Sequence, residues 1–432
     1  MSKISLDLPT IQNWNCHNCG QCCHQHGIFI SENDHQRIVD QNWRGPDGIP
    51  DEQPLFVEEK TPFSKSWRRL AHQPNGACVF LDEKGLCKIH ARFGEEAKPL
   101  ACRIYPYAFH PAGNKLAVSL RFSCPSVAGN LGKPVVRQRQ ELQSLAGQVV
   151  PKNFQDIPPP DFRPGVPLNW TDLLQICRKL EEGVTTPNTS VAVKLLRLMF
   201  WMDLVGKAKL DKIQGERLRE LLDLLSSATV TEIPQLPDDS PPPTRIGRTQ
   251  FRLLAGMYAR KDTPSNIDIT FRGRMRQLKS ALQLASGWGT LTSPQPELSA
   301  LPIEQVECIG GRLDEASEEM LTRYYQVKIH GLHFFGRAFY DVPLLEGFQS
   351  LMLTFPSILW IARWHAASRG RTTFEHADVL TALTIVDHQH GYSPAFGQWS
   401  FRARVRTLNQ MEDLPRLVTW SVQLGNQREQ EH

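Results

Sequence analysis

Four cysteines in eight residues constrain this chain more than any other feature of its sequence. Cys16, Cys19, Cys22 and Cys23 form a CxxCxxCC pattern within WNCHNCGQCCHQHG. Six further cysteines follow, at positions Cys78, Cys87, Cys102, Cys124, Cys177 and Cys308. Thiols at this spacing in a large chain usually hold a metal ion or an iron–sulfur cluster, so the first third is expected to fold around one.

Length and charge bound the remaining possibilities. At 432 residues the chain exceeds what a single compact core accommodates, so two or three domains are expected. Hydrophobic residues at 41% and charged residues at 22% are typical of a soluble globular protein. Lys and Arg number 49 against 45 Asp and Glu, an excess too small to indicate a nucleic-acid partner. The basic stretches 271–280 and 401–406 are interpreted as solvated helix faces.

The sequence gives no indication of a membrane partner. The segment MSKISLDLPTIQNW lacks the apolar run of a signal peptide. The most apolar stretch, LMLTFPSILWIA at 351–362, is shorter than the roughly 20 residues that a membrane-spanning helix requires, so it is predicted to be a buried core helix. We therefore expect a cytoplasmic protein, and a reducing compartment would keep its thiols unpaired.

The predicted fold class is mainly α: a small, irregular cysteine-rich metal-binding module followed by a helical body with proline-rich loops. The domains are predicted as residues 1–130, a proline-rich linker at 131–168, and a mostly helical body at 169–432 with breaks near 232–247 and 293–302. Segment 151–167 is read as a linker or an extended surface strap. Apolar periodicity predicts helices at 171–183, 191–208, 216–228, 251–262, 318–339, 344–368 and 376–391. For the first of these, Thr171 is the expected cap and Gly183 the expected end.

The arrangement of the thiols around a metal is left open by their spacing. A CxxC turn directs two sulfurs to one ion, and neighbouring N–H groups stabilise the thiolates. If residues 22 and 23 are extended, Cys22 and Cys23 point to opposite sides, so one site needs a remote ligand. Eight thiols could complete two four-ligand sites, or one site plus free or catalytic thiols. Thiolates suit Zn²⁺, a [4Fe–4S] or a [2Fe–2S] cluster; the alternative is a set of buried or disulfide-bonded cysteines.

Other side chains near the thiols carry two interpretations each. Four histidines could each replace a thiol as ligand, or could be solvent-exposed loop residues. They are His17, His24, His26 and His90. Arg103 could donate to a thiolate or to an anionic substrate, or form a surface salt bridge. Cys177 lies on an apolar helix face and is expected in the core, and the role of Cys308 is open.

Combined motifs in the first 125 residues resemble the YkgJ family, described as a zinc- or iron-chelating domain. The matching elements are NCGQCC at 18–23, the segment from Cys78 to His90, and KPLACRIYP at 98–106. The resemblance implies a metal-binding module whose ligands are drawn from Cys16, Cys19, Cys22, Cys23, Cys78, Cys87, Cys102 and Cys124. Of the cofactors considered, a [4Fe–4S] cluster is preferred over zinc.

The order of a cysteine cluster and a long helical region is similar to FliB, the flagellin lysine N-methylase. That resemblance implies methyl transfer from S-adenosylmethionine to lysine side chains of a protein substrate. No glycine-rich strand–turn–helix for this cofactor is present in the sequence, so catalytic and cofactor-binding residues are not assigned. Two hypotheses follow: a FliB-like protein lysine methylase, or a non-catalytic structural zinc-binding or interaction protein.

Overall fold

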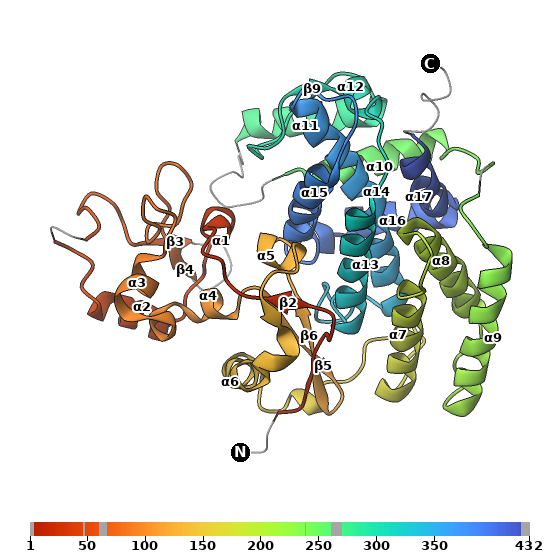
Figure 1. The fold of residues 1–432 in the computed structure, drawn as a ribbon, viewed down its shortest axis with the longest axis horizontal. Helices are drawn as coiled ribbons and strands as arrows, with labels where there is room; N and C mark the ends of the chain where they lie inside the picture. Colours follow the sequence, from red (N-terminus) through yellow and green to blue (C-terminus); the bar gives the residue numbers. More distant parts are fainter. Residues whose placement is uncertain (1–3, 46–47, 60–66, 238, 261–269, 425–432) are drawn as a thin grey trace.

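The structure is a computed structural model that describes residues 4–45, 48–59, 67–237, 239–260 and 270–424. Within these ranges the chain is mainly helical, as predicted. Figure 1 shows a loop-rich lobe containing α1 to α4 at one side and a large assembly of helices at the other. Between them lie β2 (Asn13–Trp14), β5 (Tyr107–Ala112), β6 (Lys115–Leu120) and α5 (Pro125–Ala128).

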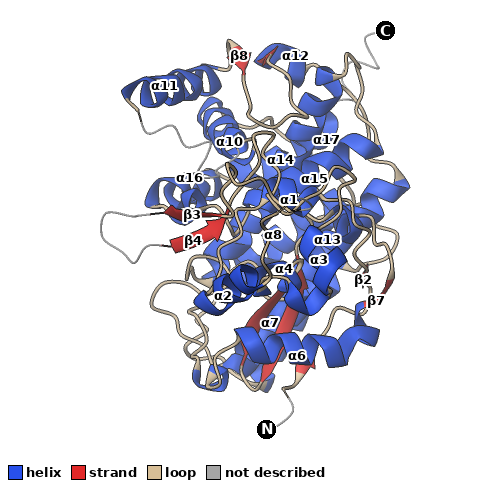
Figure 2. Ribbon diagram, turned by 90° about the vertical axis from the view of Figure 1, so that its left-hand side faces the viewer, coloured by secondary structure: helices blue, strands red, loops and turns tan. Residues whose placement is uncertain are grey.

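The loop-rich lobe contains short elements only. Its helices and strands are α1 (Gln21–Gln25), α2 (Glu32–Asp40), β3 (Phe56–Glu59), β4 (Trp67–Leu70), α3 (Lys88–Phe93) and α4 (Leu100–Ile104). Strands β3 and β4 pair as an antiparallel hairpin, which projects from the lobe in Figure 2. Helix α2 begins with a capping box, in which Ser31 and Asp34 each bind the other's backbone N–H.

A small sheet joins the lobe to the body. Strand β6 (Lys115–Leu120) lies between β5 (Tyr107–Ala112), which is antiparallel to it, and β1 (Leu6–Asp7), which is parallel to it. The β5–β6 turn uses Gly113 at φ 70°, where Trp170 packs against it. The neighbouring elements are β2 (Asn13–Trp14), α5 (Pro125–Ala128), β7 (Lys133–Pro134) and α6 (Arg139–Val149).

The body is an assembly of helices around α14 (Leu344–Ser368). The others are α7 (Trp170–Val184), α8 (Val191–Lys207), α9 (Glu216–Glu232), α10 (Arg245–Tyr258), α11 (Phe271–Ser286), α12 (Ile303–Glu307), α13 (Glu315–His330), α15 (His376–Gln389), α16 (Trp399–Gln410) and α17 (Asp413–Gln423). Two-residue strands β8 (Thr290–Leu291) and β9 (Leu301–Pro302) pair beside α12. Helix α14 passes through the middle of the body in Figure 1 and contacts α15, α16 and α17.

The apolar segment 351–362 is a core helix, as predicted. Among the described residues, α14 alone is long and apolar enough to cross a membrane, and 94% of its most apolar window is buried within the protein. Pro356 lies inside the helix. Because the surrounding helices cover α14, its apolar surface is accounted for by packing in the fold.

Most predicted helices are present, and their ends are set by caps that the periodicity did not locate. Asn169, rather than Thr171, caps α7, because its side chain accepts the Asp172 N–H. Gly183 does not end α7: it lies inside the helix, where a Cβ would come within 2.5 Å of Leu198 in α8. Small size at this position therefore serves helix packing.

The expected helix over 318–339 is wrong in its second half. Helix α13 ends at His330, and residues 331–339 turn back toward the sheet. Gly331 packs so closely on Ser119 that a Cβ would lie 2.3 Å from the serine Cβ, and Leu332 adopts a left-handed conformation at φ 53°. Of the segment expected at 251–262, residues 261 and 262 lie outside the described residues.

The described residues form two hydrophobic cores, and the division between them does not follow the division between cysteine-rich and cysteine-poor sequence. A small core lies in the loop-rich lobe and includes Trp43, Val79 and Phe80. A large core joins the body to the sheet strands, α5 and α6. The segment predicted as a linker carries α6, and its residues 157–160 form a strap without regular structure. The predicted domain boundaries themselves stay a prediction.

Candidate metal centre

The CxxCxxCC segment is a loop followed by one turn of helix. Cys16 and Cys19 lie in the loop between β2 and α1, and both are exposed. Gly20 precedes α1 in a left-handed conformation at φ 69°, and a Cβ there would lie 3.3 Å from the Gly85 carbonyl oxygen. This glycine therefore lets the thiol loop approach the Cys78–Cys87 segment closely.

The premise of extended backbone at residues 22 and 23 is wrong, because both belong to α1. Successive side chains on a helix diverge by about 100°, whereas those on a strand point to opposite faces. Interaction with the adjacent Cys23 thiol is the largest cause of the raised pKa of Cys22, followed by burial. The two neighbouring sulfurs thus lie close enough to affect each other.

Backbone pairing brings the Cys78–Cys87 segment against this turn. The Cys78 N–H donates to the Cys23 carbonyl at 2.8 Å, and Cys87 forms a bridge with Leu81 before α3 begins. Burial raises the pKa of the Cys78 thiol to about 12, with smaller contributions from Cys87 and Cys22. The CxxCxxCC turn and the Cys78–Cys87 segment therefore lie against each other.

Cys102 completes what we call the α4 thiol group, which consists of Cys22, Cys23, Cys78, Cys87 and Cys102. Burial is the main cause that raises the pKa of Cys102 well above its usual value. The nearby thiols of Cys78, Cys22 and Cys87 raise it further, whereas the Lys98 ammonium lowers it. Five thiols from three separate segments thus influence one another in the lobe.

Cys124 lies at the start of α5, on the body side of the junction. Burial is the largest cause of its raised pKa, and the Cys19 thiol adds to it. The Trp14 indole beside Cys124 acts in the opposite direction and lowers the pKa. Cys19 and Cys124 are therefore neighbours, which we call the α5 thiol pair.

A cavity of about 320 Å³ connects the two sets of thiols. It is lined by five of the eight predicted ligands, namely Cys16, Cys19, Cys22, Cys102 and Cys124. Cys23, Cys78 and Cys87 lie outside its lining but belong to the α4 thiol group. In the described parts of the chain, no three His, Cys, Asp or Glu side chains are already positioned as the ligands of one ion. The structure thus places the eight thiols together without dividing them into ligand sets.

The four histidines named from the sequence separate into different environments. His17 and His90 line the cavity; the His17 ring lies 3.1 Å from Ser126 Oγ and that of His90 3.6 Å from Glu95. His24 is exposed on α1. The His26 ring packs against Tyr105 and His388, each at 4.8 Å between centroids, and burial holds its pKa well below the usual value. Of the four, His17 and His90 have access to the thiols.

Two side chains after Cys102 have different partners. Arg103 lines the thiol cavity, forms an ion pair with Glu96 at 2.5 Å and donates to Gln148 at 3.4 Å. Tyr105 lines the cavity and lies 3.3 Å from Ser123 through its hydroxyl. The peptide bond between Tyr105 and Pro106 is cis.

Lys98 was not identified from the sequence as a site residue, although it begins the KPxxCRxYP motif. Burial opposes its charge, but Glu95, bound at 3.0 Å, together with Cys102 and Cys87, raises its pKa overall. Its ammonium therefore favours ionised thiols at Cys22 and Cys102. The sequence feature that could have identified Lys98 is its position in this motif, as a basic residue shortly before Cys102.

The donor set fits a metal ion or cluster bound by thiolates. Neutral thiols do not repel one another, whereas neighbouring thiolates do. A bound cation compensates the negative charges of the thiolates and so removes their repulsion. Four sulfur ligands suit both a structural zinc site and an iron–sulfur cluster. The cysteines would bind the metal ion or cluster through their sulfur atoms, and Lys98, Trp14 and Tyr105 would lie around it.

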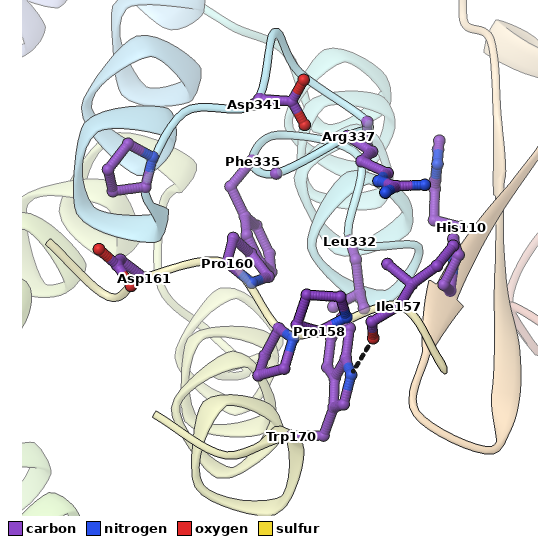
Figure 3. Close-up of a pocket in the computed structure, with 15 residues that line it drawn as sticks. His110, Ile157, Pro158, Pro160, Asp161, Trp170, Leu332, Phe335, Arg337 and Asp341 are labelled. Atoms are coloured by element: carbon purple, nitrogen blue, oxygen red, sulfur yellow. Dashed lines mark hydrogen bonds between the residues drawn. The ribbon is translucent and has the colours of Figure 1, made fainter. Parts of the chain in front are cut away.

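A second cavity, of about 350 Å³, lies apart from the thiols beneath the proline strap (Figure 3). Trp170 stands beside Pro158 there and donates its indole N–H to the Ile157 carbonyl at 3.0 Å. His110 forms part of the wall, and its ring packs on that of buried His333 at 4.8 Å between centroids. Sequence motifs gave no indication of this cavity, because its lining comes from three distant segments.

Comparison with known proteins agrees with the sequence motifs. Residues 15–125, about a quarter of the chain, match the family model CxxCxxCC, described as a "Putative zinc- or iron-chelating domain". The chain is also 34% identical over 56 residues to the flagellar biosynthetic protein FliU of Salmonella muenchen. That similarity spans 13% of this chain and only 33% of the relative's length. No solved structure matches the chain.

Proposed function

We propose that this protein is a cytoplasmic metalloprotein whose eight N-terminal cysteines bind a [4Fe–4S] cluster or zinc. The observation that carries the proposal is the convergence of thiols from four chain segments on one junction, with five of these thiols around a single cavity. The chelating-domain match over residues 15–125 supports metal binding in the coarser sense. Four thiolates complete either a zinc site or a [4Fe–4S] cluster, so eight thiols are enough for two such sites of either kind.

A catalytic role is the finer part of the proposal. We propose that the chain is a FliB-like protein lysine N-methylase that uses S-adenosylmethionine. The architecture of a thiol module before a helical body supports it, as does the short similarity to a flagellar biosynthetic protein. The alternative is a non-catalytic protein in which zinc only holds the lobe together, and the small size of the lobe core favours that reading.

Metal identity is tested first, on the full chain purified without oxygen. We expect a broad absorbance near about 400 nm that dithionite bleaches, with iron and acid-labile sulfide in equal amounts. A colourless protein with stoichiometric zinc would exclude the cluster while preserving metal binding. Protein that contains neither metal after purification and reconstitution would overturn the proposal.

Methyl transfer is tested separately, with S-adenosylmethionine labelled at the methyl group and flagellin as the protein substrate. Label in lysine side chains, lost in Cys102→Ser and preserved in the matched variant Cys308→Ser, would support a methylase that depends on the metal. Cys308 is exposed and lies away from the thiol cavity, so its substitution controls for general thiol loss. Metal-loaded protein that neither binds the cofactor nor transfers label would favour the non-catalytic alternative.

A further inference from the structure

In the described part of the chain, helix α11 packs mainly on α10 and on strand β8. Leu284 packs on α10, where a Cβ at Gly256 would come within 2.5 Å of its Cδ1 atom. Thr249 of α10 donates its hydroxyl to the Ala285 carbonyl at 3.2 Å. Figures 1 and 2 show α11 at the upper edge of the molecule. Among the described residues, the side of α11 that carries Met275, Leu278 and Leu282 is exposed.

This exposed side carries a narrow apolar stripe. Met275, Leu278 and Leu282 are 49%, 52% and 63% exposed, although each is a large hydrophobic residue. Their spacing of three and four residues aligns them along one face, since each residue advances about 100° around the helix. The same repeat places Leu284 roughly on the other side of the helix. Three exposed apolar side chains in one row indicate a contact surface more strongly than isolated ones do.

Cations flank the stripe. Arg272 and Lys279 follow it on one side and Arg274 on the other, and all three are exposed. The sequence of α11, FRGRMRQLKSALQLAS, contains four basic residues and no acidic one. Interpretation of 271–280 as an ordinary solvated face accounts for the basic residues but leaves the exposed row of apolar ones unexplained.

We propose that this face of α11, defined by Met275, Leu278 and Leu282 with its flanking cations, docks an acidic amphipathic helix of a partner protein. An apolar seam at positions i, i+3 and i+7 is the pattern by which two helices pack side by side, and charges beside the seam select the partner. The basic flanks require Asp and Glu in the corresponding positions of the partner. A row at i, i+3 and i+7 is the narrow seam along which two helices pack, so it favours a partner helix over a lipid surface. This inference is independent of the metal and of catalysis.

Two synthetic helical peptides test the charge requirement. Each has about three heptads with Leu at positions a and d; one carries Glu at e and g, the other Lys. We expect the labelled Glu peptide to bind the full-length protein in a fluorescence-anisotropy titration, and to bind more weakly as salt is raised to about 0.5 M. The Lys peptide is expected not to bind. Equal binding of both peptides, or of neither, would overturn the proposal.

Protein variants test the location. The double variant Leu278→Gln/Leu282→Gln is expected to weaken binding of the Glu peptide at least about tenfold, because it removes the centre of the seam. Leu224→Gln is the matched control, since Leu224 is 69% exposed on the distant helix α9. Unchanged thermal melts would show that these exposed substitutions leave the fold intact. Wild-type affinity in the double variant would reject α11 as the site.

A lipid surface is tested as the competing occupant. Vesicles of phosphatidylcholine with about one-third phosphatidylserine are sedimented with the protein at low salt, where anionic lipids attract basic helices most strongly. We expect the protein to stay in the supernatant. Sedimentation that Leu278→Gln/Leu282→Gln abolishes would replace the partner helix with a membrane.

Discussion

The loop-rich lobe and the helical body are stabilised by different means. Among the described residues, the lobe core consists of nine buried ones, namely Ile38, Trp43, Ile49, Leu70, Ala71, Cys78, Val79, Phe80 and Ile89. In the body, α14 alone is 25 residues long and buried over nearly its whole length. A region with so few buried apolar groups lies near the limit of what hydrophobic burial can stabilise, whereas the body lies well above it. We therefore expect the stability of the lobe to depend on a group bound by its thiols, and that of the body to depend on apolar packing.

The thiols are also divided between the two cores. Cys78 is part of the lobe core, and Cys23 and Cys87 pack against it. Cys124 belongs to the large core, together with the sheet and the body. A metal or cluster at the junction would therefore link the lobe to the body as well as the segments of the lobe to one another.

Metal removal should separate the two regions most clearly. We expect a chelator, or Cys22→Ser or Cys78→Ser, to unfold the lobe, because structural metal sites contribute on the order of 10 kcal/mol to the folding of small modules. Hydrogen exchange measured by mass spectrometry should become fast over 67–104 and stay slow in α14. Cys177→Ser is the control, since Cys177 is buried in α7 and should leave the metal content unchanged. Equal metal retention in all three variants would contradict the predicted ligands.

The next largest effect is expected at a buried ion pair that joins the body to the Cys124 turn. Lys328 of α13 lies 2.6 Å from Asp387 of α15, and both side chains are at most 1% exposed. Asp387 also accepts the backbone N–H of Ser123 at 2.9 Å. Asp387→Asn leaves the Lys328 charge without its partner, which should cost about 3–5 kcal/mol of unfolding free energy in urea titrations. The double variant Lys328→Met/Asp387→Asn should recover part of the loss; no recovery would mean that the Ser123 contact dominates.

A glycine in α14 tests how tightly the body is packed. A Cβ at Gly347 would lie 2.0 Å from the Phe334 carbonyl oxygen, which belongs to backbone and cannot move aside easily. Gly347→Ala should therefore lower the free energy of unfolding of the body by about 3 kcal/mol. Gly206→Ala in α8 is the matched control, because its Cβ would meet Leu345 at an ordinary 3.5 Å. If both variants melt at the same temperature, the close approach of α14 to residue 334 is wrong.

The smallest effect is a pH dependence confined to the body. Burial lowers the pKa of His330, but the hydrogen bond and charge of Glu181, with the charge of Asp7, outweigh it and raise the pKa overall. A raised folded pKa stabilises the protein below about pH 6.5, and this contribution is lost as pH rises through the folded pKa. His330→Gln should therefore cost less than about 1 kcal/mol at pH 6 and nothing near pH 9, as measured by urea unfolding. A larger cost at the higher pH would reverse the assigned sign.

Much of the fold and part of the site could be predicted from local patterns. Apolar periodicity located α7, α8, α9, α14 and α15, because each helix buries one or more continuous faces. The motifs identified the thiols that meet at the junction. The motifs could not show that Cys22 and Cys23 share a helical turn. Helix α1 has only five residues and follows a glycine, so it is too short to show an apolar periodicity. The cap of α7 and the end of α13 also depend on neighbours that lie far away in the sequence.

By itself, the sequence determined that this chain is mainly helical, that α14 is a core helix, and that its first third carries the thiol motifs of a zinc- or iron-chelating domain. Those conclusions depend on residue type and spacing, which are local properties. Only the tertiary structure decided that Cys124 approaches from the body core, that Lys98 lies among the thiols, and that α11 exposes an apolar row. Each of these depends on which distant surfaces pack together, and packing of distant surfaces leaves no periodic signal in the chain. CxxCxxCC is thus one side of a junction whose other side is built by the body.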